Sequence, residues 1–129
     1  MRLEWDAWHG DNTDTETLED PAPDDVDRAV RRLDQRRYTE LALHGSGGQY
    51  LAVGGGLGCY HVYVASVEHE DSVVLQSTIA KSGFEELISG GRLLRLPARS
   101  VVGLAEAARA AQTFLRTDRP DPALGWATS

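Results

Sequence analysis

The side chains best suited to chemistry include the single cysteine and a histidine that follows it closely. Cys59 and His61 are two residues apart, so in a β-strand they would share one face. A nucleophilic cysteine needs a lowered pKa, a base within reach and a group that orients the base, and the sequence marks no such third group. As metal ligands they number two, whereas a structural zinc site uses four. The pair therefore predicts ordinary strand residues, and no metal is expected.

Neighbouring acids are the next candidates, because two carboxyl groups can act as general acid and base. Glu85 and Glu86 fall in a strand-like stretch, where adjacent side chains point to opposite faces and cannot form a pair. Residues 68–71 are expected to form a polar turn, and Asp24-Asp25 to stand at a helix start, where acids have structural roles. We therefore expect no enzymatic activity and no cofactor.

A glycine-rich segment, Gly54-Gly55-Gly56-Leu57-Gly58, is the part of the sequence most similar to a phosphate-binding loop. Such a loop connects a strand to a helix whose N-terminal amides face the phosphate. Here the following segment, Cys59–Val67, is rich in Val and Tyr and predicts a strand. The glycines therefore predict a hairpin connection that uses positive φ angles.

Charge is distributed very unevenly along the chain. Residues 1–27 contain ten acidic side chains and one basic side chain, Arg2, so the formal net charge of −7 arises in this segment. Such a field repels nucleic-acid phosphates and attracts basic surfaces. Two interpretations stay open: the acids solvate a flexible segment, or they meet a basic protein partner.

Length and composition set the broad class. A chain of 129 residues predicts a single domain over residues 1–129. One cysteine excludes an intrachain disulfide and is typical of a reducing compartment. No apolar run approaches the roughly 20 residues of a membrane span, and the first ten residues lack the pattern of a secretory signal. We therefore expect a cytoplasmic protein that binds neither membrane nor nucleic acid.

The hydrophobic periodicity predicts an α+β fold with elements in β-α-β(n)-α order. Two apolar stripes of helical period predict amphipathic helices over 24–37 and 103–117, packed on an antiparallel sheet of about five to six strands. In the first strand, Leu3, Trp5 and Ala7 alternate on one side, and Trp8 departs from that pattern. Residues 9–22 are polar and predict an acidic loop. The other predicted strands are 38–44, 49–53, 59–67, 72–78, 84–88 and 92–96, the last pairing ended by Pro97. The expected core includes Val30, Leu33, Val62, Val64, Leu104, Ala108, Ala111 and Leu115.

The C-terminal third carries an ordered set of short motifs. In order, these are Gly90-Gly91-Arg92, Leu96-Pro97-Ala98, Val101-Val102, an alanine-rich helix ending in Phe114-Leu115, Arg119-Pro120 and Trp126. Their order and spacing resemble the Imm1 family, the immunity proteins of bacterial polymorphic toxin systems, over residues 38–126. Asp118 departs from the family pattern, which has glycine before Arg-Pro.

The resemblance implies a protein that binds and neutralises a cognate toxin domain. Toxins associated with this family include nucleic-acid-directed enzymes such as deaminases, so the implied mechanism is blockage of a basic cleft. Two alternatives stay open: a regulatory interaction module without a toxin, and a small-ligand-binding domain, which would need a concave pocket lined by polar groups. The residues expected to contact a basic partner are the acids of the N-terminal segment and of the polar turn, with one aromatic anchor: Trp8, Asp11, Asp14, Glu16, Glu19, Asp20, Glu68, Glu70 and Asp71.

Overall fold

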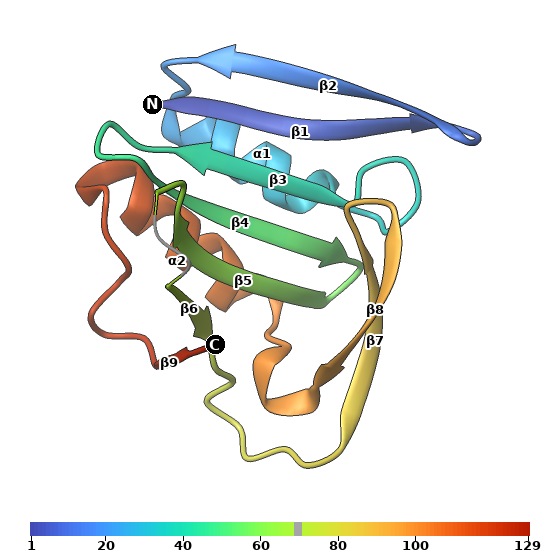
Figure 1. Cartoon of the computed structure of the whole chain (residues 1–129), viewed down its shortest axis with the longest axis vertical. Helices are drawn as coiled ribbons and strands as arrows, with labels where there is room; N and C mark the ends of the chain where they lie inside the picture. Colours follow the sequence, from blue (N-terminus) through green and yellow to red (C-terminus); the bar gives the residue numbers. More distant parts are fainter. Residues whose placement is uncertain (69–70) are drawn as a thin grey trace.

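The computed structural model describes residues 1–68 and 71–129 as one antiparallel sheet, a separate β-hairpin and two α-helices (Figure 1). The α+β prediction is confirmed, with nine strands in the described residues where about five to six were expected. The large sheet has the order β2-β1-β3-β4-β5-β6-β9, and β7 pairs with β8. The elements are β1 Arg2–His9, β2 Asn12–Glu19, α1 Pro23–Arg32, β3 Glu40–His44, β4 Gln49–Gly56, β5 Cys59–Ser66, β6 Ser72–Leu75, β7 Phe84–Ser89, β8 Arg92–Pro97, α2 Leu104–Thr117 and β9 Trp126–Thr128, with a short 3-10 turn at Ala98–Ser100.

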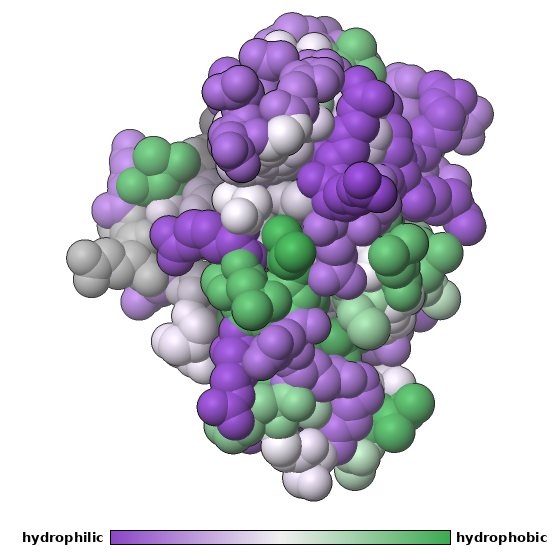
Figure 2. All heavy atoms as spheres, turned by 90° about the vertical axis from the view of Figure 1, so that its right-hand side faces the viewer, coloured by the Kyte–Doolittle hydropathy of each residue, from purple (hydrophilic) through white to green (hydrophobic). Residues whose placement is uncertain are grey.

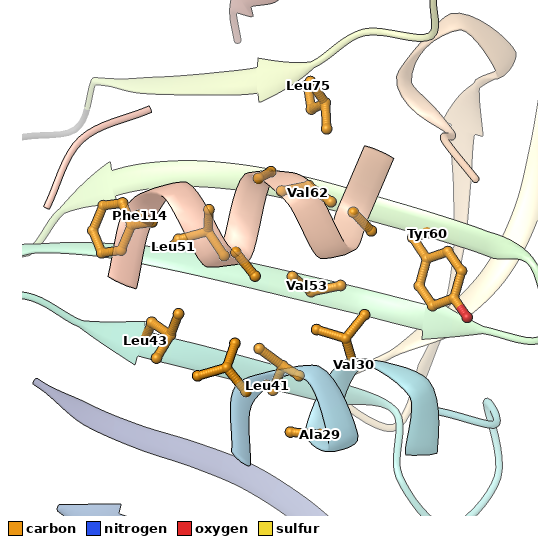
Figure 3. Close-up of a cluster of buried hydrophobic side chains, with 14 of the residues drawn as sticks. Ala29, Val30, Leu41, Leu43, Leu51, Val53, Tyr60, Val62, Leu75 and Phe114 are labelled. Atoms are coloured by element: carbon orange, nitrogen blue, oxygen red, sulfur yellow. The ribbon is translucent and has the colours of Figure 1, made fainter. Parts of the chain in front are cut away.

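The two faces of the large sheet differ in what covers them. Both helices lie behind the sheet in Figure 1. Strand register places Leu41 beside Val53, and Val53 beside Val62, on the helix side. Figure 3 shows these side chains directed toward α1 and α2, with Phe114 completing the cluster. The hydrophobic core therefore fills the space between the helices and one face, and the opposite face carries the alternate residues of each strand.

Helix α1 is confirmed as a helix but is shorter than predicted. Its start is stabilised by Asp25, whose carboxylate accepts the Ala22 N–H at 2.8 Å. It ends at Arg32, because one oxygen of Asp34 accepts the backbone N–H groups of Arg36, Arg37 and Tyr38. Residues 33–37 therefore lie outside the helix, where further helix was predicted, and the strand predicted from residue 38 begins only at Glu40.

Helix α2 is confirmed at nearly the predicted bounds. It ends at Thr117, and the next residue, Asp118, has a left-handed φ of 60°. Its buried stripe, however, is rotated from the predicted one. Ala107, Ala110, Ala111 and Phe114 are the buried apolar residues, because α2 packs against both α1 and the sheet. The predicted burial was wrong for three core residues, which are only half-buried, and confirmed for the other five. The half-buried three are Leu104, Ala108 and Leu115.

The predicted loop over residues 9–22 was wrong for most of its length. Residues Asn12–Glu19 form β2, which pairs with the whole of β1 and lies at the edge of the sheet. Every residue of β2 is exposed. The acidic segment is thus an ordered strand, and its side chains alternate between the two faces of the sheet.

Only the last part of the glycine segment forms the predicted connection. Its first three glycines, residues 54–56, extend strand β4. The β4–β5 hairpin is confirmed, with its turn at Leu57 and Gly58, whose φ angles are 57° and 91°. Gly54 and Gly56 are in the strand, where a Cβ would collide with Ser89 and with the carbonyl of Leu33, respectively. These glycines let β7 and the end of α1 approach β4 closely.

Two strands in the C-terminal half also differ from expectation. Strand β6 ends at Leu75, earlier than residue 78, and Trp126 begins β9, a strand that the sequence did not predict. The β7–β8 hairpin is confirmed, and Pro97 is its last paired residue. Within the described residues, no helix has the length and apolar character needed to cross a membrane.

Candidate partner-binding surface

Five of the predicted acidic contact residues belong to the β1–β2 hairpin and the residue that follows it. We call Asp11, Asp14, Glu16, Glu19 and Asp20 the acidic hairpin. All five are exposed, and the part of the molecule that contains them, at the top of Figure 2, is mostly hydrophilic. Glu16 accepts a hydrogen bond from the indole of Trp5 at 2.9 Å, and Asp14 lies 3.6 Å from His9. The hairpin therefore presents its acids on a defined framework.

The second predicted acidic group lies far from the acidic hairpin. Glu68 and Asp71 are exposed residues beside the β5–β6 connection, and Glu70 lies outside the described residues. Four strands, β1, β3, β4 and β5, separate β2 from β6 in the sheet (Figure 1). The structure therefore does not bring the two acidic groups together, and a partner that contacts both must extend across the sheet.

Trp8 lies on the face opposite the helices, together with Glu4 and Asp6. Its indole N–H donates to Asp6 at 2.9 Å, and its ring contacts Gly91 in the β7–β8 turn. The side chain is half-buried. Trp8 thus connects β1 to the turn, and only part of its surface faces solvent.

Asp6, which the sequence did not indicate, accepts four hydrogen bonds that connect neighbouring segments. One of its oxygens accepts the backbone N–H groups of Thr39 at 2.7 Å and Glu40 at 3.1 Å. The other accepts the indole N–H of Trp8 and the hydroxyl of Thr39. The Thr39 hydroxyl in turn accepts the N–H of Gly91 at 2.9 Å. One carboxylate therefore joins β1, the start of β3 and the β7–β8 turn.

A row of four rings crosses the face opposite the helices. The ring centroids of His44 and Tyr50 are 5.6 Å apart, those of Tyr50 and Tyr63 are 6.1 Å apart, and those of Tyr63 and His61 are 5.6 Å apart. They come from β3, β4 and β5, and each ring is half-buried. We call this row, together with Glu4 and Glu40 beside it, the open face.

The carboxylates of the open face have polar neighbours. Glu4 pairs with His44 at 2.9 Å and with Arg2 at 3.1 Å. Glu40 accepts a hydrogen bond from Ser89 at 2.8 Å. Burial raises the pKa of Glu40, the Ser89 bond opposes this, and the nearby Asp6 adds to it. Burial also raises the pKa of Tyr63, with Glu40 contributing. The open face is therefore aromatic and acidic.

The open face also contains a shallow hollow. Its volume is about 220 Å³, and its walls include Glu4, Asp6, Trp8 and Glu40. Three carboxylates and an indole around one concavity provide acceptors for a cationic group and an aromatic surface on which such a group can stack.

Cys59 and His61 both lie on β5. The Nδ1 atom of His61 is 3.4 Å from the carbonyl oxygen of Ser100, and burial lowers the pKa of His61. Cys59 is a half-buried free cysteine. Across residues 1–68 and 71–129, no three His, Cys, Asp or Glu side chains are grouped so that they could hold a metal ion.

An exposed acidic hairpin and an uncovered aromatic face are features of a protein that acts through its surface. The family model described as immunity protein Imm1 matches residues 14–128. The chain therefore belongs to the Imm1 family of immunity proteins, which confirms the resemblance and extends it from residues 38–126 into β2. A search of curated proteins found no match.

Proposed function

We propose that this protein binds a cognate toxin domain and neutralises it by covering the surface on which the toxin binds its substrate. The observation that carries this proposal is the match to the immunity protein family, which extends over nearly the whole chain. The proposed toxin acts on nucleic acid, for example as a deaminase, and binds it in an electropositive cleft. Inhibition then needs no catalytic group and no cofactor, and it takes place in the cytoplasm, where such a toxin meets its substrate.

The acidic hairpin supports a basic partner. Its five exposed acids lie within residues 1–27, the segment in which the net negative charge of the chain arises. Negative charge of this kind raises the rate of encounter with a cationic surface, and this effect weakens as the salt concentration rises. We infer that the acidic hairpin steers the toxin to its binding position, with Trp8 as an aromatic contact. Glu68, Glu70 and Asp71 are proposed as a second, separate contact.

The direct test is protection of growing cells. Any candidate toxin domain encoded by a reading frame beside this gene is expressed in a bacterium, alone and together with this protein. We expect growth to stop in the first case and to continue in the second. An unrelated protein of the same net charge is the control for charge alone. Failure of the folded protein to protect would contradict the proposal and favour a regulatory module that has no toxin partner.

A further inference from the structure

The face of the sheet opposite the helices has the composition of a protein interface. Tyr and Trp are enriched among the residues that dominate binding energy, and such residues usually occupy the centre of an interface. Here Tyr50, Tyr63, His44 and His61 form a continuous row across three central strands. In Figure 1 the sheet lies in front of both helices, so this face of β3, β4 and β5 is turned toward the viewer. The acidic hairpin lies at the edge of the same sheet.

The row is held on a rigid base, which lowers the entropic cost of binding. Ala42 pairs with Ala52, and Ala52 pairs with Tyr63, so small residues lie next to the rings on the open face. Ala52 is only 1% exposed although no helix covers this face, because larger side chains surround it. The rings are therefore packed in place before any partner arrives.

The charge of the open face specifies the chemistry of the partner. Among the described residues, no ion pair engages Glu40 or Asp6, although each carboxylate accepts hydrogen bonds. Burial, opposed by the Ser89 hydrogen bond and reinforced by Asp6, makes ionisation of Glu40 less favourable than that of an exposed glutamate. A cationic group brought by a partner would relieve this, and a guanidinium could also stack on a tyrosine ring.

We propose that the open face is the part of the interface that holds the toxin, and that it receives an arginine- or lysine-bearing segment of the toxin. This inference rests on the proposed function. The two surfaces then have different kinetic roles: the acidic hairpin raises the association rate, and the open face sets the dissociation rate. Charged residues at a rim act mainly on association, whereas buried aromatic and charged contacts act on dissociation.

The first test measures the kinetics of binding to the toxin domain encoded beside the gene. Tyr50→Ala and Tyr63→Ala are each expected to raise the dissociation rate at least about 10-fold with little change in association. Glu40→Gln, whose amide oxygen still accepts the Ser89 hydroxyl, is also expected to raise it. Phe84→Ala is the matched control, because Phe84 is an aromatic residue that is 61% exposed on the separate β7–β8 hairpin.

The second test needs no substitution, so it holds even if a tyrosine variant fails to fold. The ring protons of His44 and His61 report on the open face by NMR, and those of His9 report on the β1–β2 hairpin. On addition of the toxin domain, we expect the His44 and His61 signals to shift strongly.

The outcomes separate this inference from the proposed function. Absence of binding by the wild-type protein would contradict both. Tight wild-type binding with unshifted His44 and His61 signals, or wild-type dissociation rates in the folded tyrosine variants, would overturn the inference and leave the immunity role standing.

Discussion

The indole of Trp8 occupies the space that a side chain at Gly91 would need. Trp8 also donates to Asp6, Asp6 accepts the hydroxyl of Thr39, and Thr39 accepts the N–H of Gly91. This closed set of contacts fixes the β7–β8 turn against β1. It therefore fixes one end of the open face as well.

Replacement of Gly91 tests this junction. Gly91→Ala combines a positive φ of 75° with a Cβ that would overlap atoms of the Trp8 indole. We expect the free energy of unfolding to fall by about 2–4 kcal/mol, measured by urea denaturation. Gly47→Ala is the control, because nothing lies within 4 Å of its added Cβ and its φ is not in the left-handed region. Equal stability of the two variants would show that the turn is not fixed in this way.

The helices and most strands follow from the hydrophobic pattern, and β2 shows where that pattern stops being informative. Both faces of β2 are exposed, so its alternation of Thr with Asp and Glu has no apolar side except Leu18. A period of two becomes visible only when one face is buried. Likewise β9 has three residues, too few to show a period.

Glu40 should make stability depend on pH in an unusual direction for a carboxylate. Burial raises its pKa above the ordinary 4.5 in the folded protein, opposed by the Ser89 bond and reinforced by Asp6. The folded state therefore binds this proton more tightly, and the contribution of Glu40 to stability declines as pH rises from 4.5 through the folded pKa.

Glu40→Gln removes that effect and keeps an acceptor for Ser89. We expect the variant to be more stable than the wild type at pH 7, with the difference shrinking toward pH 4. Thermal unfolding across this pH range is the measurement. A variant that is less stable at pH 7, or a difference that does not change with pH, would count against the pKa of Glu40 as described.

Two adjacent residues of α2 test the position of its buried stripe. Phe114 is completely buried, so Phe114→Ala should lower the free energy of unfolding by about 3–5 kcal/mol. Leu115 is half-buried, and Leu115→Ala should lower it by only about 1–2 kcal/mol. Chemical denaturation of both variants gives the comparison, and a larger loss for Leu115→Ala would mean that the stripe is misplaced.

Neutralising the acidic hairpin tests electrostatic steering. In the variant Asp14→Asn, Glu16→Gln, Glu19→Gln and Asp20→Asn, we expect slower association with the toxin domain, about 10-fold at low salt, and a weaker dependence on salt. Stopped-flow or surface-based kinetics at several salt concentrations provide the measurement. Glu86→Gln removes one exposed acid from β7 and should leave the association rate nearly unchanged. An unchanged rate in the quadruple variant at low salt would refute steering by this hairpin.

The candidate site was only partly accessible from the sequence. The acidic hairpin was indicated by the excess of Asp and Glu in residues 1–27, because the charge of a segment can be counted without knowledge of its structure. The row of His44, Tyr50, Tyr63 and His61 depends on which strands are neighbours and on which face the helices cover. Alternation shows which residues of one strand share a face, but strand order comes from the tertiary structure. The available signal was that polar aromatic residues occupy the positions opposite Leu and Val in each strand.

Neutralisation of a toxin by direct binding is tested most directly by titration of toxin activity. A fixed amount of the candidate toxin domain is mixed with increasing amounts of this protein, and the activity of the toxin on nucleic acid, its proposed substrate, is measured. We predict a linear loss of activity that is complete near one equivalent. Full toxin activity in the presence of excess folded protein would contradict the account.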